Sequence, residues 1–167
     1  MKLAQPDSPE QAAVMETYLL PGGLSAAAVP VRCTTILGSC VAVCLFDPGR
    51  AGGMNHFQLP GIAPHDDPDP LRWSDTACER LLVETLAAGG RRAHLQAKVF
   101  GGASITTHAV PDRLRIGQRN AEAADAALRR MGIPVTVADV GGQAGRKLVF
   151  EFHTGKAWIR SLAHHAG

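Results

Sequence analysis

Cys40 and His56 are the two residues of this sequence whose types and spacing are best suited to covalent chemistry. They stand sixteen residues apart, Cys40 directly after a glycine and a serine, and His56 within the segment GGMNHFQLP. A glycine close before a nucleophile permits a tight turn and a close approach of a ligand. If the chain turns back between the two segments, at Gly52 and Gly53, the imidazole becomes a neighbour of the thiol.

A thiol beside an imidazole can hydrolyse a carboxamide. A nearby imidazolium lowers the pKa of a thiol and yields a thiolate, which attacks the carboxamide carbon. His56 can then donate a proton to the departing ammonia and later deprotonate the water that hydrolyses the thioester. A cysteine peptidase also forms an acyl-enzyme intermediate. Cys40 and His56 therefore indicate the type of reaction but do not identify the substrate.

This chemistry needs two further groups. Backbone N–H groups of the turn at Gly38, Ser39 and Cys40 are the natural donors to the oxyanion that forms in each step. A third group should hold the imidazole in one orientation and one tautomer. No acidic residue stands near His56 in the sequence, so a hydroxyl from the adjacent pair at positions 34 and 35 is the candidate, Thr34 or Thr35.

A zinc site is the main alternative for these residues, because three of the four cysteines and His56 would supply four ligands. The spacing lacks a CxxC knuckle, and Cys40 and Cys44 flank an apolar strand rather than a tight turn. We therefore predict no metal and no cofactor. We expect Cys33, Cys44 and Cys78 to be buried as small hydrophobic side chains.

The composition is that of a globular protein, with 46% apolar residues, 19% charged residues and a formal net charge of +2. Arginines are spread along the chain, so no basic stripe indicates nucleic-acid binding. No apolar run has the length of a membrane span, and the polar N-terminus lacks the apolar centre of a signal peptide. The sequence thus predicts a cytoplasmic protein without membrane insertion.

The chain is long enough for one domain with a substantial core. We expect residues 1–15 to form a flexible leader, because two prolines and several polar residues interrupt regular structure there. Residues 16–167 are then a single domain. Within it, the Pro- and Asp-rich segment 59–72 is predicted to be a surface loop that directly follows the candidate site.

Hydrophobic periodicity predicts two helices and several strands. One helix is capped by Ser74 or Asp75 and ends at Gly89-Gly90, and the other spans Gln118–Met131. The strands are expected at Val41–Phe46, Gly53–Phe57, Leu95–Phe100, Val135–Val140, Lys147–Phe152 and Ala157–Ser161, with a hairpin turn at residues 153–156. The helices do not alternate with the strands, which indicates an α+β fold with a layered, sandwich-like β-sheet core flanked by helices.

Four segments carry a further signal when they are taken together. They are TTILGSCVAVCLFDP, GGMNHFQLP, AKVFGGASI and IGQRNAEAADAALRRMGIPVTVADVGGQAGRKLVFEFHTGKAWIR. In this order they resemble the CheD family of chemoreceptor glutamine deamidases, from about Pro30 to Arg160. The combination of LGSCV, GGMxHxxLP, FGGA, IGxRN and DVGG…GRK is specific, whereas YLLPGGLSAAAVP matches poorly.

The resemblance implies a fold similar to the catalytic domain of the cytotoxic necrotizing factor deamidase toxins, and a Cys-His-Thr triad. By motif, the cysteine is Cys40, the histidine is His56, and the threonine is Thr34, six residues before the cysteine. The neighbouring Thr35 stays open as an alternative for the third role.

The activity implied by the resemblance is hydrolytic deamidation of specific glutamines to glutamate, with a thioester intermediate and release of ammonia. The substrates would be the cytoplasmic helices of chemotaxis receptors, the methyl-accepting chemotaxis proteins. A CheC-type phosphatase is an implied partner in organisms that possess one. A non-catalytic adaptor that binds the receptor or this phosphatase is the alternative, although the intact Cys40 and His56 favour an enzyme.

Several residues outside the triad are candidates for shaping the site. Gly101, Gly102 and Ala103 follow a predicted strand and could line a substrate cleft, or form a turn that needs positive φ. Asn120 is expected to cap the second helix and could also contact the neighbouring loop. Arg146, after a glycine pair, could touch the substrate or a regulator, or be the solvated end of a hairpin.

Overall fold

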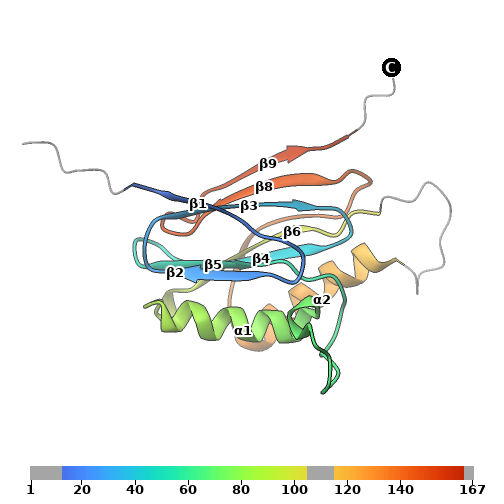
Figure 1. The fold of residues 1–167 in the computed structure, drawn as a ribbon, viewed down its shortest axis with the longest axis horizontal. Helices are drawn as coiled ribbons and strands as arrows, with labels where there is room; N and C mark the ends of the chain where they lie inside the picture. The colour runs from blue at the N-terminus through green and yellow to red at the C-terminus, as the bar shows by residue number, and fades with distance from the viewer. Residues whose placement is uncertain (1–12, 105–114, 164–167) are drawn as a thin grey trace, which may run out of the picture.

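The computed structural model describes residues 13–104 and 115–163, and the strands of this part form two sheets (Figure 1). Sheet A consists, in spatial order, of β1 (Met15–Tyr18), β3 (Val31–Leu37), β8 (Arg146–Glu151) and β9 (Ala157–Ser161). Sheet B consists, in spatial order, of β2 (Leu24–Ala27), β5 (Ala51–Asn55), β4 (Val41–Asp47), β6 (Gln96–Gly101) and β7 (Val135–Val140). Both sheets are mixed, since β1 runs parallel to β3 and β7 runs parallel to β6.

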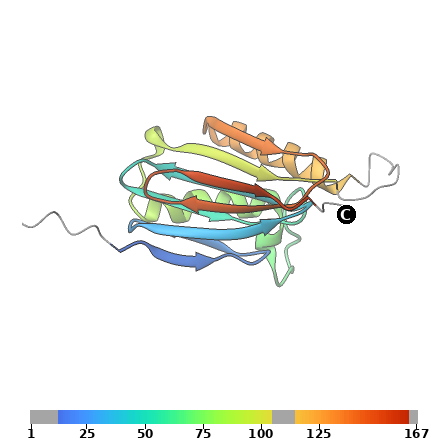
Figure 2. The same cartoon turned by 90° about the horizontal axis from the view of Figure 1, so that it is seen from above.

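Two helices, α1 (Ser74–Ala87) and α2 (Ile116–Met131), cover the face of sheet B that is turned away from sheet A (Figure 1). Single 3₁₀ turns, η1 (Pro70–Arg72) and η2 (Arg92–His94), precede α1 and β6. Seen from above, α2 lies along β6 and β7 (Figure 2). The molecule therefore has three layers: sheet A, sheet B and the helices. The predicted layered α+β fold is confirmed.

Strand β4 lies at the centre of these layers, and all seven of its residues are buried. Val41, Val43 and Leu45 belong to the core between sheet B and the helices. Ala42 and Cys44 face the other way, into the core between the two sheets. Because successive side chains of a strand point to opposite faces, an apolar strand such as this one can serve two cores at once. The predicted burial of this strand on both sides is confirmed.

The turn between β3 and β4 carries the chain from one sheet to the other. Strand β3 ends in sheet A at Leu37, and β4 begins in sheet B at Val41. The intervening residues, Gly38 to Cys40, are half-buried. The candidate nucleophile therefore sits at one end of the sandwich, where the inter-sheet core meets the surface.

Most predicted elements are present, and their boundaries differ by a few residues at most. The two helices and the six predicted strands all form, and Gly155 has the positive φ of the predicted hairpin turn. Strands β1, β2 and β3 were not among the predictions. In β3 the segment VRCTTIL alternates between more and less buried residues, which is the ordinary signal of a strand with one face in a core.

Two local predictions are wrong. Gly52 and Gly53 lie inside β5 rather than in a turn, and both pack so closely that a Cβ would collide with Phe152 or with the backbone of Ser25. The turn itself lies earlier, between β4 and β5. The N-cap of α1 is Trp73, one residue before the predicted caps at positions 74 and 75.

The predicted surface loop at residues 59–72 is ordered around one carboxylate. Asp67 accepts hydrogen bonds from the Trp73 indole N–H at 2.8 Å and from the Arg72 guanidinium at 3.1 Å. These donors, together with the Asp69 backbone N–H, hold the pKa of Asp67 below its ordinary value. The loop is therefore tied to the start of α1.

Most of the predicted leader, residues 1–12, lies outside the described residues. The division into a leader and one domain stays a prediction. No helix in the described ranges 13–104 and 115–163 combines the length and apolarity needed to cross a membrane.

Candidate active site

Cys40 is the half-buried last residue of the turn that joins the two sheets. Its carbonyl oxygen accepts a hydrogen bond from Gly102 N at 2.8 Å, and the Gly38 carbonyl accepts one from Ala103 N at 2.9 Å. Its side chain packs against the inter-sheet core. Two backbone contacts thus fix the nucleophile turn against the end of β6, while the thiol stays partly accessible.

His56 follows β5 and is almost fully buried, with 1% of its surface exposed. Its backbone N–H donates to the Gly23 carbonyl at 3.2 Å, and its carbonyl accepts from Gly22 N at 2.8 Å. The connection between β1 and β2 therefore holds the histidine from outside the sheet. The segment YLLPGG of this connection contains no motif from which its contact with the histidine could be predicted.

The register of sheet B places Cys40 and His56 on the same face. Val41, at the start of β4, and Phe57, just after β5, form an isolated antiparallel bridge with backbone hydrogen bonds of 3.1 and 3.0 Å. Cys40 precedes one member of this bridge and His56 precedes the other, so in an antiparallel pair the two side chains are diagonal neighbours. Such neighbours are spaced by about 7–8 Å or somewhat less at Cβ, within reach of a long side chain. Both face the space between the sheets.

Thr35, on the facing strand β3, reaches across to the imidazole. Its Oγ1 lies 2.8 Å from His56 Nδ1, and its hydroxyl donates to the Leu19 carbonyl at 2.7 Å. A hydroxyl has one proton to donate. Because that proton goes to Leu19, Thr35 must accept from the imidazole, and Nδ1 carries the hydrogen. The neutral ring is therefore held in the tautomer whose Nε2 has a free lone pair.

Thr34, the residue that the family motif assigned to this role, does not face the histidine. Along β3 the residues that face the inter-sheet core are Cys33, Thr35 and Leu37, whereas Thr34 is half-buried between them. Side chains alternate along a strand, so the side chain of Thr34 points to the outer face of sheet A. The alternative left open in the sequence, Thr35, is the one that contacts His56.

Nε2 of His56 is buried and has no hydrogen-bond partner among the described residues, the Cys40 thiol included. Buried polar atoms are nearly always paired, so an unpaired one calls for an explanation. A lone pair held on the same face as a thiol suits a base that accepts the thiol proton. Hydrogen bonds between catalytic groups are often long in the free enzyme and shorten when substrate binds.

Burial disfavours the charged form of both groups. Burial lowers the pKa of His56 to about 4. Burial also raises the pKa of the Cys40 thiol, and its own backbone N–H partly opposes that rise. Desolvation therefore disfavours both charges of the thiolate–imidazolium pair expected from the sequence, and that pair stays a prediction. A neutral His56 would be available as a base.

Three glycines bring the supporting elements close to the nucleophile. Gly101 and Gly102 have φ values of 110° and 67°, a backbone conformation that favours glycine. A Cβ on Gly101 would collide with the Cys40 carbonyl, and one on Gly117 of α2 would collide with the carbonyls of Gly102 and Ala103. The turn with positive φ is thus present. A cleft-lining role for Gly101, Gly102 and Ala103 stays a prediction.

Asn120 does not cap α2, which begins at Ile116 with Arg115 as its N-cap. It lies inside the helix, fully buried, and its amide donates to the Ser39 carbonyl at 3.0 Å and the Gln58 carbonyl at 2.9 Å. The predicted contact with a neighbouring loop is therefore confirmed, and that loop is the nucleophile turn.

The other three cysteines are fully buried, as predicted. Burial raises the pKa of Cys33 and of Cys78 to about 12, and raises that of Cys44 well above its ordinary value. Within residues 13–104 and 115–163, no three His, Cys, Asp or Glu side chains gather in a way that could hold a metal ion.

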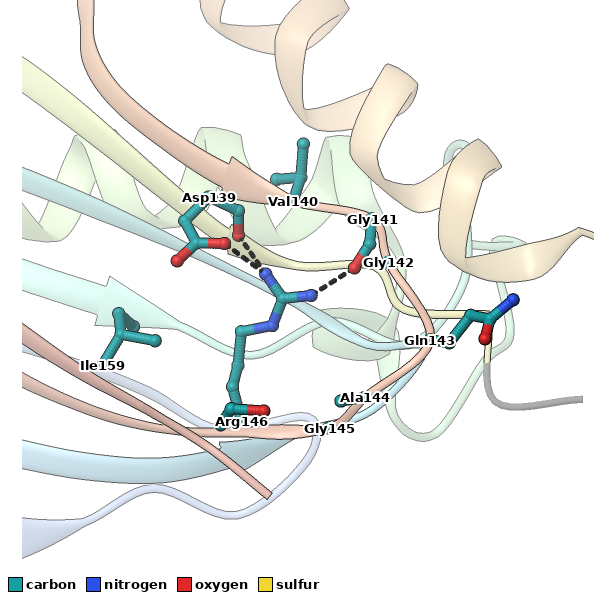
Figure 3. Close-up of a pocket in the computed structure, with 10 residues that line it drawn as sticks. Asp139, Val140, Gly141, Gly142, Gln143, Ala144, Gly145, Arg146 and Ile159 are labelled. Atoms are coloured by element: carbon teal, nitrogen blue, oxygen red, sulfur yellow. Dashed lines mark hydrogen bonds and ion pairs between the residues drawn. The ribbon is translucent and has the colours of Figure 1, made fainter. Parts of the chain in front are cut away.

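A hollow of about 260 Å³ lies next to the nucleophile turn, between the ends of β7 and β8. Arg146 crosses it and donates to the Asp139 carbonyl and carboxylate at 2.6 Å each, and to the Gly141 carbonyl (Figure 3). The guanidinium points toward the end of β7, and only 7% of the residue is exposed. The interpretation of Arg146 as the solvated end of a hairpin is wrong.

A partly exposed thiol, a buried imidazole of fixed tautomer and the threonine that fixes it define a candidate site of the cysteine–histidine type on an α+β scaffold. The CheD family, described as chemotactic sensory transduction, matches residues 58–161, a span that begins just after His56 and includes Asn120.

Individual relatives extend the match over most of the chain. "Probable chemoreceptor glutamine deamidase CheD 1" of Anaeromyxobacter dehalogenans (strain 2CP-C) is 45% identical over 148 residues, 88% of this chain and 85% of the relative. "Probable chemoreceptor glutamine deamidase CheD" of Desulfitobacterium hafniense (strain DSM 10664 / DCB-2) is 40% identical over 133 residues, 78% and 83% of the two chains. A relative of the same name from Trichlorobacter lovleyi is 42% identical over 146 residues, 85% and 88%. The chain belongs to the CheD family.

Proposed function

We propose that this chain hydrolyses the side-chain carboxamide of specific glutamines in chemoreceptors, giving glutamate and ammonia. Cys40 is the nucleophile, His56 the base, and Thr35 the group that orients the base. The observation that carries this proposal is the unpaired Nε2 of His56, fixed in its lone-pair tautomer on the face that Cys40 shares. The names of the relatives support the choice of substrate.

In the first half-reaction the Cys40 proton moves to His56 Nε2 while Sγ forms a bond to the carboxamide carbon. The carbonyl electrons move to oxygen, and backbone N–H groups of the Gly38–Cys40 turn, including that of Cys40 itself, stabilise the oxyanion. When the oxyanion collapses, the C–N bond breaks and the imidazolium gives its proton to the nitrogen. Ammonia leaves, and a glutamyl thioester remains on Cys40.

In the second half-reaction water replaces ammonia. His56 Nε2 takes a proton from the water as its oxygen attacks the thioester carbon. Collapse of the second oxyanion breaks the C–S bond, and the proton returns to the sulfur. The products are a glutamate side chain and the free Cys40 thiol. Each turnover adds a negative charge to the receptor at neutral pH, which changes the local electrostatics in the same sense as other charge-adding modifications.

The resting neutrality of the pair is compatible with this sequence of steps. An imidazole with a pKa of about 4 is unprotonated at neutral pH, so it is always ready to accept the thiol proton. It is a weak base, and oxyanion stabilisation must therefore supply much of the driving force for proton transfer. A substrate amide that enters the site brings polar groups with it and reduces the desolvation of both charges.

The proposed substrate places the protein in the cytoplasm, where the receptor's signalling helices lie. A CheC-type phosphatase, in organisms that possess one, is a second proposed partner. This part of the proposal rests on family membership alone.

The test is to incubate the chain with receptor cytoplasmic fragments and to measure ammonia release and intact mass. Deamidation replaces NH₂ by OH and adds about one mass unit per site without cutting the backbone, and loss of the nucleophile should lower turnover by roughly three or more orders of magnitude. Cys40→Ala is the test variant, and Cys44→Ala, a buried thiol of β4 that belongs to the same inter-sheet core, is the matched control.

Three outcomes would speak against the proposal. Cleaved fragments would make the chain a cysteine peptidase. Binding of the receptor without any change in its mass would make it an adaptor. Equal turnover by the wild type and Cys40→Ala would remove Cys40 from the mechanism.

A further inference from the structure

The start of β4 and the segment that follows β5 make one isolated backbone bridge immediately before the candidate nucleophile. Val41 and Phe57 form this bridge. Beyond it, the backbone N–H groups of Gln58 and Leu59 turn away and donate to the Arg72 carbonyl at 2.8 and 2.9 Å. The segment that follows His56 therefore separates from the turn that precedes β4, and no backbone hydrogen bond between these described residues fixes their spacing at that point.

The carboxamide of Asn120 occupies this place. Its single NH₂ group donates to the Ser39 carbonyl on one side and to the Gln58 carbonyl on the other. Rotating the amide by a half-turn would set its oxygen against both carbonyls, so the two acceptors determine its orientation. Asn120 thus takes the place of a further backbone bridge. It links the nucleophile turn, at Ser39, to the segment that follows His56, at Gln58.

The helix that carries Asn120 is held against the turn with little freedom. Gly117, one helical turn earlier, touches the carbonyls of Gly102 and Ala103 at a distance that leaves no room for a Cβ. Residues three apart on a helix share a face. The close approach at Gly117 therefore brings Asn120 into the gap between the two strands.

The hydrogen bond to Ser39 also fixes the direction of a catalytic donor. The Ser39 carbonyl and the Cys40 N–H belong to one planar trans peptide unit and point in opposite directions. Because Asn120 holds the carbonyl, the Cys40 N–H must point away from the helix. That N–H lies close enough to the Cys40 sulfur to oppose the rise of its pKa, and it is a donor to the oxyanion in the proposed mechanism.

One further atom indicates that packing alone does not explain this residue. Asn120 is 0% exposed, and its Oδ1 has no hydrogen-bond partner in the described part of the chain. A buried position that only had to be filled would favour an apolar side chain, which leaves no polar atom unpaired.

We propose that Asn120 is a positioning residue for the reaction: its carboxamide sets the spacing between the Cys40 turn and the His56 strand and aims the Cys40 backbone N–H. This inference rests on the proposed function for its kinetic consequences, and on the geometry alone for its effect on the thiol.

The test variants are Asn120→Leu, which keeps the volume and removes both donor contacts, and Asn120→Asp, which keeps the shape and opposes both carbonyls. Leu128→Ala is the control, because Leu128 lies on the same helix and is fully buried in the core between sheet B and the helices. Each protein is assayed for thermal stability, for deamidation of receptor fragments, and for the pH profile of Cys40 alkylation by iodoacetamide. Cys40→Ser shows which alkylation belongs to Cys40, since the other three thiols are fully buried.

We expect both Asn120 variants to lower kcat by roughly 10–100-fold with KM within about threefold, because a small misplacement of reacting groups affects the chemical step. Alkylation of Cys40 should slow, and its profile should move to higher pH, because the N–H no longer favours the thiolate. Leu128→Ala should lose stability and keep both properties.

A purely structural role predicts the reverse for the thiol. A loosened turn exposes Cys40 more, so faster alkylation, or a profile equal to the wild type, overturns the proposal. The proposal is also overturned if the Asn120 variants and Leu128→Ala lose equal stability and show the same decrease in kcat. If the wild type itself does not deamidate receptor fragments, the proposed function fails while the alkylation profiles still decide the role of Asn120.

Discussion

The nucleophile turn and the hollow at Arg146 are neighbours, but they differ in whether their buried polar groups have hydrogen-bond partners. Leu37, which leads into the turn, pairs with Arg146 across sheet A, and Gly142 at the rim of the hollow accepts a hydrogen bond from Ser104 N. In the hollow, the Arg146 guanidinium donates hydrogen bonds to oxygens of Asp139 and Gly141 (Figure 3). Beside the turn, His56 has a buried nitrogen without a hydrogen-bond partner in the described part of the chain.

This difference indicates which of the two regions has polar groups available for a reaction. The hollow has volume but its charged group is already neutralised, so a ligand would have to compete with existing ion pairs. The site at Cys40 holds a thiol and, on the same face of a sheet, an imidazole nitrogen that has no partner among the described residues. Unpaired buried polar groups carry an energetic cost that persists when a function requires them.

The largest expected effect is a difference in turnover between a variant of the candidate site and a variant of the hollow. His56→Ala should lower turnover of receptor fragments by at least roughly two orders of magnitude, as expected for the loss of a general base. Arg146→Ala should leave turnover within about threefold, and should lower the free energy of unfolding by roughly 1–3 kcal/mol because two carbonyls lose their donor. Steady-state ammonia release and urea unfolding measure the two quantities. A larger kinetic effect for Arg146 than for His56 would reverse the comparison.

A smaller effect on kcat is expected from substituting the adjacent Thr34 and Thr35, whose side chains lie on opposite faces of β3. Thr35→Val removes the acceptor that fixes the tautomer of His56, and should lower kcat by roughly 10–100-fold, like the loss of other groups that orient a catalytic histidine. Thr34→Val should stay within about twofold of the wild type, because its side chain lies on the outer face. The assay is the same ammonia release. If Thr34→Val is the slower variant, the assignment made here is wrong and the family motif assigns the residue correctly.

A third expected effect concerns stability rather than rate, and it is a pH dependence. The pKa of His56 is about 4 in the folded chain, below the ordinary value of 6.5. Between these values the unfolded chain binds a proton that the folded chain does not, so stability is complete above about pH 6.5 and falls toward pH 4, by a total on the order of 3 kcal/mol. Unfolding in urea at a series of pH values measures this loss.

Two variants isolate the contribution of His56 to that dependence. His56→Gln should flatten the curve in this pH range, because the titrating group is gone. His94→Gln should leave it unchanged, because His94 is exposed on η2. An equal slope in the wild type and His56→Gln would show that His56 is not buried in its neutral form.

Much of the fold could be predicted because its signals are local. The apolar run of β4, the periodicity of α1 and α2, and the glycine that ends α2 at position 132 each depend on a few neighbouring residues. The short strands β1 and β2 have four residues each and little β-branched character, so they acquire their structure from pairing with β3 and β5. Such tertiary pairing leaves only a weak trace in a sequence.

The candidate site was predictable in its residue types and less so in its details. Cys40 and His56 could be paired because a turn between two strands makes them neighbours. The choice of Thr35 over Thr34 depends on which face of β3 meets sheet B, and the neutrality of the pair depends on burial. The amide of Asn120 comes from a helix far along the chain, and only the assembled layers show that it reaches the turn.

The central claim, that Cys40 forms a covalent acyl intermediate with a glutamine side chain, can be tested by trapping that intermediate. Wild-type protein is mixed with a receptor peptide, quenched in acid after a short delay, and measured by intact mass spectrometry. We predict a species with the mass of the protein plus the peptide minus ammonia, localised to Cys40 and absent in Cys40→Ala. Turnover of the peptide without any such adduct, at delays that span a single turnover, would contradict the thioester route.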